Sequence, residues 1–111
     1  ITTHHFKELE QLLEVYFDYF KNNPAVLSAI VNASIEGFAL QKQSDYLLDF
    51  FKMRIKNQQP APIEIAYYSG AIFASLLYWR ENDYQYSAVE LAEQLAEKIK
   101  NDLLQTGEKI F

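Results

Sequence analysis

The chain has 111 residues, of which 50% are hydrophobic and 15% aromatic, enough to form the core of one domain. It contains no cysteine, which excludes disulfides and cysteine-based metal or redox chemistry. Its net charge of -5 and scattered Lys and Arg residues would repel a phosphate backbone, so this chain alone is not expected to bind nucleic acid strongly.

Apolar residues at helical spacing fill the first half of the chain. The first such pattern runs from residue 3 to residue 22. Pro24 ends that helix, because the residue before a proline avoids helical geometry, and it suits the first turn of a second helix that reaches about residue 33. A third pattern covers residues 38 to 57, and Gly37 is expected to break or kink the chain before it. Whether residues 24 to 57 form one bent helix or two is open at this stage.

The second half predicts two long helices around a tight turn. Pro62 follows the loop NQQPA and opens a helix that reaches residue 80. Ser87 with Glu90 three residues later is a capping-box pattern, so a last helix should run from residue 88 to about residue 104, with Gly107 as a stop signal. Strand-type alternation is absent. The sequence therefore predicts an all-α bundle of five or six helices that forms one domain over residues 1–111.

The helix that begins at Pro62 is apolar on nearly every side. One stripe consists of Ile63, Ala66, Tyr67, Gly70, Phe73, Ala74 and Leu77, and the other of Ile65, Tyr68, Ile72, Leu76 and Trp79. At residues 65–79 the apolar run is shorter than the ~20 residues that span a bilayer, so no membrane contact is expected. A small domain covers one stripe with its own core, and the other is expected to face a second molecule.

Three segments near the last turn resemble a known family. WREND at residues 79–83, YS at 86–87 and ELA at 90–92 are similar to the last helix pair of TetR-family transcriptional regulators, where a tryptophan closes one helix and a serine opens the next. The resemblance is strongest from residue 62 to residue 104 and looks closest to AcrR-like repressors and the regulators of dihydroxyacetone kinase. Asp83 stands where glycine is expected, but aspartate tolerates turn conformations.

The resemblance implies the ligand-binding and dimerisation domain of a cytoplasmic regulator that uses no cofactor. The chain starts at Ile1 and its only methionine is Met53, so a helix-turn-helix DNA-binding domain is expected in front of it, and DNA would be bound only through that domain. The family also implies a homodimer with a four-helix seam. The expected seam residues are Tyr68, Gly70, Phe73, Leu77, Leu91, Leu95 and Ile99, although periodicity does not decide which stripe faces outward.

Eight tyrosines and eight phenylalanines are a high aromatic content for a small helical domain. An apolar cavity with a few convergent polar groups is how proteins hold small ligands, and buried tyrosine hydroxyls supply such groups. The candidate residues for binding a small-molecule effector are Tyr16, Phe17, Phe20, Tyr46, Phe50, Met53 and Tyr67. The alternative is that these side chains only fill the core.

Catalytic and metal-binding patterns are weak. His4 and His5 are the only histidines, and neighbouring residues of a helix point about 100° apart, which makes them a poor metal clamp. The carboxylates of Glu10, Glu14 and Asp18 share a helical face, which we interpret as a solvated surface. No metal site and no enzymatic activity are expected. The main alternative to a regulator is a free-standing helical module that binds another protein and has no ligand pocket.

Overall fold

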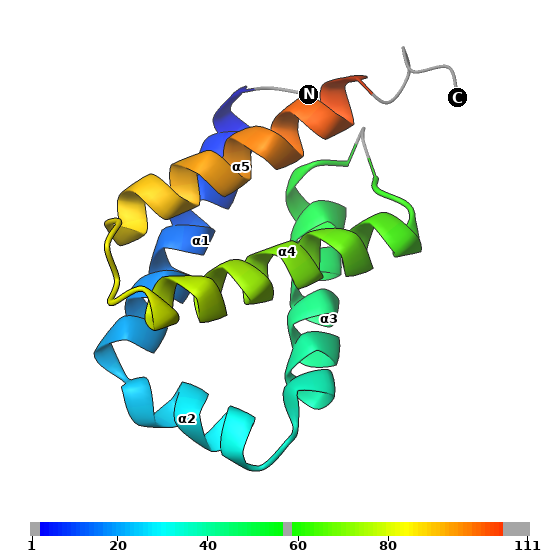
Figure 1. The fold of residues 1–111 in the computed structure, drawn as a ribbon. Coiled ribbons are helices and arrows are strands. Elements are labelled where there is room, and N and C mark those ends of the chain that lie inside the picture. Colours follow the sequence, from blue (N-terminus) through cyan, green and yellow to red (C-terminus); the bar gives the residue numbers. More distant parts are fainter. Residues whose placement is uncertain (1–2, 57–58, 106–111) are drawn as a thin grey trace.

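The computed structural model describes residues 3–56 and 59–105, and this part of the chain folds into five α-helices without a strand. The helices are α1 (Thr3–Asn22), α2 (Pro24–Asn32), α3 (Glu36–Arg54), α4 (Pro62–Glu81) and α5 (Ala88–Gln105) (Figure 1). The predicted all-α class is confirmed, and the helices that sequence periodicity placed are all present. Gly107 and the start of the loop before Pro62 lie outside the described residues.

Residues 24 to 54 form two helices, which answers the question left open by the sequence. After α2, Ser34 adopts a left-handed backbone with φ 57°, and the N–H of Ile35 donates to the carbonyl of Ile30 at 3.1 Å. The chain therefore turns at Ser34, directly after the predicted end of the second helix near residue 33, and the break expected at Gly37 is not present. Gly37 lies in the first turn of α3 and has no positive φ.

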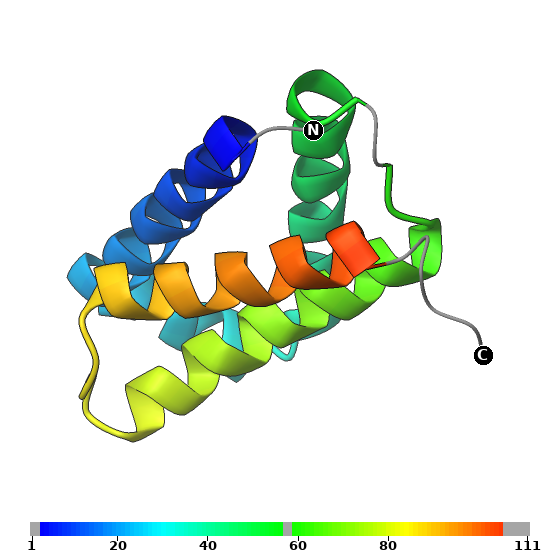
Figure 2. The ribbon, with the colours of Figure 1, turned by 90° about the horizontal axis from the view of Figure 1, so that it is seen from above.

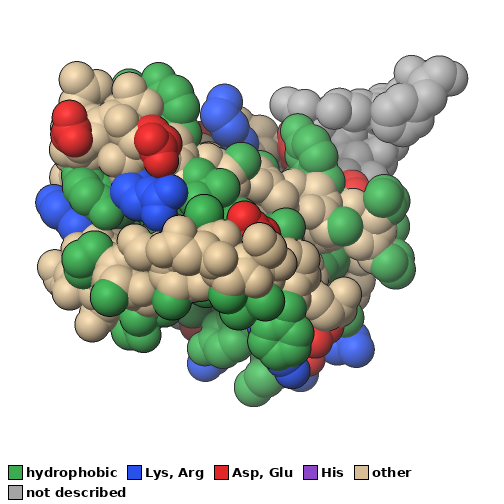
Figure 3. All heavy atoms as spheres, turned by 60° about the horizontal axis from the view of Figure 1, so that its bottom comes forward, with side chains coloured by type: hydrophobic (Ala, Val, Ile, Leu, Met, Phe, Trp, Pro, Cys, Tyr) green, Lys and Arg blue, Asp and Glu red, His purple; other side chains and the backbone are tan. Residues whose placement is uncertain are grey.

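The helices form two layers. In Figure 2, α4 and α5 lie on one side of the molecule and α1 and α3 on the other. Helix α1 packs along α5 and helix α3 along α4, while α2 joins the ends of α1 and α3. Figure 3 brings the α2 end of the molecule forward and shows hydrophobic side chains at the surface between charged ones. Phe38 at the start of α3 is 62% exposed, and the Lys42 ammonium lies 5.5 Å from the centre of its ring.

Trp79 fixes the end of α4 against the rest of the core. Its side chain is 1% exposed, and its ring meets the Phe17 ring edge-on with the centroids 5.7 Å apart. The indole N–H donates to the carbonyl of Tyr86 at 2.8 Å, and the Tyr84 ring lies 4.9 Å away. One tryptophan thus joins α1, α4 and the turn that leads to α5.

The turn between α4 and α5 contains two residues with a left-handed backbone. Asp83 has φ 57° and Tyr84 has φ 55°, so the aspartate at the expected glycine position does adopt a left-handed conformation. The capping box is confirmed: the Glu90 N–H donates to Ser87 Oγ at 3.1 Å, and the Ser87 N–H donates to Glu90 Oε1 at 3.2 Å.

Candidate functional site

A groove runs between α1 and α3, and Ile72 of α4 also lines it. It consists of a wider hollow of about 520 Å³ and a more apolar hollow of about 400 Å³, which share Leu12, Val15 and Tyr46. Glu8, Gln11, Asp49, Phe50, Met53 and Arg54 complete the wider hollow, and Leu13, Tyr16, Tyr19, Lys42, Gln43, Leu47 and Ile72 complete the apolar one. Both volumes lie in the range of small-molecule sites.

Large apolar side chains in this groove are left uncovered by the subunit. Val15 on α1 is 67% exposed, and Tyr46 and Met53 on α3 are 66% and 68% exposed. They face a shared hollow instead of being scattered singly over the surface. Exposed apolar side chains that cluster in a concave surface are typical of a binding site.

A partly buried amide, Gln43, forms the polar floor of the apolar hollow. The Tyr16 hydroxyl donates to Gln43 Oε1 at 2.6 Å, and Gln43 Nε2 donates to the Ser69 carbonyl at 2.7 Å and to Ser69 Oγ at 2.9 Å. Burial raises the pKa of Tyr16 well above its ordinary value, which keeps the phenol neutral. Because Ser69 is fully buried on α4, this network connects the groove on α1 and α3 to a third helix.

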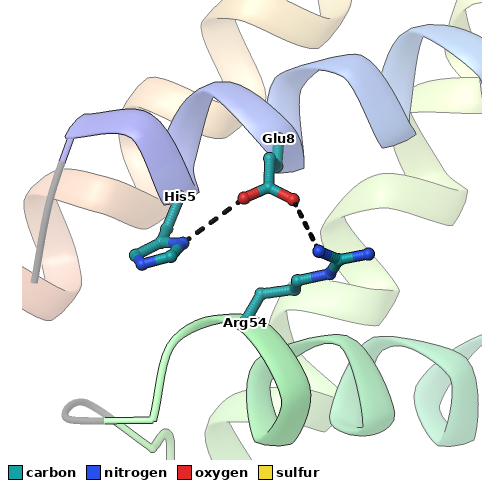
Figure 4. Close-up of polar contacts among 3 residues, drawn as sticks. All are labelled: His5, Glu8 and Arg54. Carbon is teal, nitrogen blue, oxygen red and sulfur yellow. Dashed lines mark hydrogen bonds and ion pairs between the residues drawn. The ribbon is translucent and has the colours of Figure 1, made fainter.

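An ion pair joins α1 and α3 at two residues that line the wider hollow (Figure 4). Arg54 at the end of α3 lies 3.2 Å from Glu8 Oε2 on α1, and Glu8 Oε1 lies 3.3 Å from His5 Nδ1. The Arg54 side chain is 54% exposed, so solvent screens the pair and its contribution to stability is small. Within the described part of the chain, the carboxylate of Asp49 on the same wall has no ion pair or hydrogen bond.

The predicted effector residues are divided between the groove and other places. Tyr16, Tyr46, Phe50 and Met53 all line the groove. Phe17 is fully buried against Trp79, and Phe20 packs on the core beside Tyr16. Tyr67 lies on α4, outside the residues that line the groove, and is 67% exposed.

Sequence reasoning did not identify Val15, Gln43 and Asp49 as groove residues. Val15 belongs to a second apolar row with Leu12 on α1, and Gln43 interrupts the α3 row between Leu40 and Leu47. A polar residue at a core-facing helical position is a signal of a buried network. Asp49 gave no such signal, because an aspartate on a helix surface is ordinary.

Helix α4 carries a second uncovered surface. Ile63, Tyr67 and Tyr78 are 76%, 67% and 63% exposed, and the small residues Gly70 and Ala74 lie between them at helical spacing. A Cβ added to Gly70 would meet no atom within 4 Å, so packing inside the subunit does not require glycine here. We call the stripe of Ile63, Tyr67, Gly70, Ala74 and Tyr78 the outer α4 stripe.

The predicted seam residues are also divided by the structure. Tyr68, Phe73, Leu95 and Ile99 are no more than 9% exposed inside one subunit, so little of their surface is available to another molecule. Gly70, Leu77 and Leu91 are partly exposed. Leu91 borders a hollow of about 360 Å³ between α4 and α5, together with Ala74 and Tyr78 of the outer α4 stripe.

Comparison of the sequence with known families matches residues 7–101 to TetR_C_8, the transcriptional regulator C-terminal region. The chain belongs to the TetR family. The match covers most of the chain, including the first half, where the resemblance was weaker. It confirms the resemblance drawn from the last helix pair. No curated protein and no solved structure matches the chain significantly.

Membership in this family makes the chain a regulatory domain and not an enzyme. Within residues 3–56 and 59–105 of this TetR C-terminal region, no three His, Asp or Glu residues are grouped as metal ligands are. None of the described helices has the length and apolarity needed to cross a membrane.

Proposed function

We propose that residues 1–111 are the regulatory domain of a cytoplasmic TetR-type transcriptional regulator, which forms a homodimer and senses a small molecule. The outer α4 stripe is the observation that carries this proposal. It presents exposed Ile63, Tyr67 and Tyr78 around a glycine that the subunit itself does not need. A second copy of the same stripe would cover these side chains by a twofold contact.

Helix α5 would complete the dimer seam. Leu91 is partly exposed beside Ala74 and Tyr78, so a second subunit that rests on α4 also reaches the start of α5. Small residues at 70 and 74 would let two copies of α4 approach closely. The seam proposed here therefore keeps Gly70, Leu77 and Leu91 from the sequence prediction and adds the three large residues of the outer α4 stripe.

The groove between α1 and α3 is the proposed effector site. Four features support it: two adjacent hollows, exposed apolar walls, a polar floor at Gln43 and a link from that floor to α4. A molecule bound there would favour one arrangement of α1 and α3 over others. In a regulator with DNA-binding domains attached in front of α1, this shift of population would change the separation of the two DNA-reading heads.

Binding of the neutral dye Nile red tests the effector site, because its fluorescence rises when it leaves water for an apolar groove. We expect saturable binding to the full chain that is weakened by Val15→Asp, which places a charge between both hollows. Val89→Asp is the matched control, since Val89 is an exposed valine of α5 outside the groove. Equal binding by the two variants, or none by the unmodified chain, would remove the groove from the proposal and favour a protein-binding module.

A further inference from the structure

We infer that the groove between α1 and α3 selects amphipathic cations, molecules with an uncharged apolar body and one positively charged end. This inference rests on the proposed effector site and specifies the chemistry of its ligand. The apolar hollow would hold the apolar body of the ligand, and the wider hollow, which Asp49 lines, would hold the charged end. The reason is the distribution of charge along the groove.

The apolar hollow offers almost no charge to a ligand. Its walls are Leu12, Leu13, Leu47 and Ile72 with tyrosine rings at the edge. Lys42 is its only charged lining residue among those described, and the ammonium group of Lys42 lies over the ring of Phe38, which does not line the groove. The Tyr16 hydroxyl already donates to Gln43. An uncharged alkyl or aryl group therefore suits this hollow best.

The wider hollow has an excess of negative charge. Its charged lining residues are Glu8, Asp49 and Arg54, and Arg54 is paired with Glu8 at 3.2 Å. Asp49 remains as a carboxylate without an ion pair among the described residues. The net charge of -5 on the whole chain acts in the same direction.

Aromatic rings stand next to this carboxylate. Tyr46, Asp49, Phe50 and Met53 follow one another at helical spacing on the groove-facing side of α3. A cation near Asp49 would lie in a hollow that aromatic rings also line, and both carboxylates and aromatic rings attract positive charge. An anion at the same place would be repelled by Asp49 and would share Arg54 with Glu8.

Three eight-carbon compounds that differ in their end group test this inference by titration calorimetry with the full chain: octyltrimethylammonium, octan-1-ol and octanoate. We expect the ammonium compound to bind about fivefold more tightly than the alcohol, since a partly exposed charge pair and a cation–π contact each contribute modestly. Octanoate should bind most weakly. Added salt should reduce the preference for the cation, because the charges are exposed to solvent.

Two substitutions locate the charge that produces the preference. Asp49→Asn should bring the affinity for octyltrimethylammonium close to that for octan-1-ol and leave the alcohol unaffected. Asp45→Asn is the matched control, since Asp45 lies one turn earlier on α3, outside the groove, and accepts a hydrogen bond from Gln41. Asp45→Asn should leave the affinities for the three compounds nearly unchanged.

The outcomes separate the two proposals. Binding of none of the three compounds would overturn the effector groove together with this inference. Equal or tighter binding of the alcohol or the carboxylate would overturn the cation preference and leave the groove as an effector site. A cation preference that survives Asp49→Asn would also overturn the inference, because the charge would then come from elsewhere.

Discussion

Replacing Tyr67 with glutamate should separate the proposed dimer without unfolding the subunit. Tyr67 is 67% exposed on the outer α4 stripe, so a charge there meets only water in a monomer. In the dimer, one ring from each subunit would lose its contact. Full burial of a large apolar side chain contributes ~1.5 to 3 kcal/mol, so two rings that are each two-thirds exposed contribute about 2 to 4 kcal/mol.

That loss corresponds to a dissociation constant raised about 30- to 1,000-fold. Desolvation of two carboxylates in the seam would weaken association further. Sedimentation velocity across a concentration series measures the shift from dimer to monomer. Far-ultraviolet circular dichroism of the same samples checks that the helix content of the variant equals that of the unmodified chain.

Tyr46→Glu is the control for this experiment. Tyr46 is also a helical tyrosine and is 66% exposed, but it faces the groove between α1 and α3. The same substitution at this position should leave the dimer intact. The reasoning would be refuted if the unmodified chain sediments as a 13.0 kDa monomer at all concentrations, or if the two variants weaken association equally.

Four further predictions concern the stability of the subunit. Phe73→Ala should cost ~3 to 5 kcal/mol in urea unfolding, as removal of a buried ring does, because Phe73 is only 5% exposed; a loss below ~1 kcal/mol would contradict its place in the core. Gln43→Leu removes the acceptor of the Tyr16 hydroxyl and should cost ~1 to 3 kcal/mol in the same assay, whereas an unchanged midpoint would show that water replaces the amide. Ser87→Ala removes an N-cap and should cost ~1 kcal/mol, with Ser87→Gly expected to cost less. Burial raises the pKa of Tyr16, and burial together with the charge of nearby Asp102 raises the pKa of Tyr68 to about 12, so both phenols stay neutral in the fold. The stability they contribute is complete below the ordinary pKa of 10.0 and is lost as pH rises toward the raised pKa values, so the unfolding midpoint should fall between pH 10 and pH 12, and less steeply in Tyr16→Phe.

The sequence by itself determined the helices and most of their ends. Pro24 and Pro62 open helices, and Ser87 with Glu90 caps the last one, because these signals act between residues a few positions apart. The same local pattern around Trp79 was enough to identify the family. The left-handed backbone of Ser34 was missed, because serine carries no strong preference for that conformation.

Only the tertiary structure decided which side of each helix is covered. Both stripes of α4 are apolar in sequence, yet Ile65, Tyr68, Ile72, Leu76 and Trp79 are buried, whereas most of the other stripe is exposed. Phe73 belongs to the exposed stripe by spacing and is buried all the same. Burial depends on which helices pack on α4 and at what angle, and periodicity within one helix holds no information about its neighbours. For the same reason the groove between α1 and α3, with Gln43 at its floor, became visible only when residues far apart in the sequence were brought together.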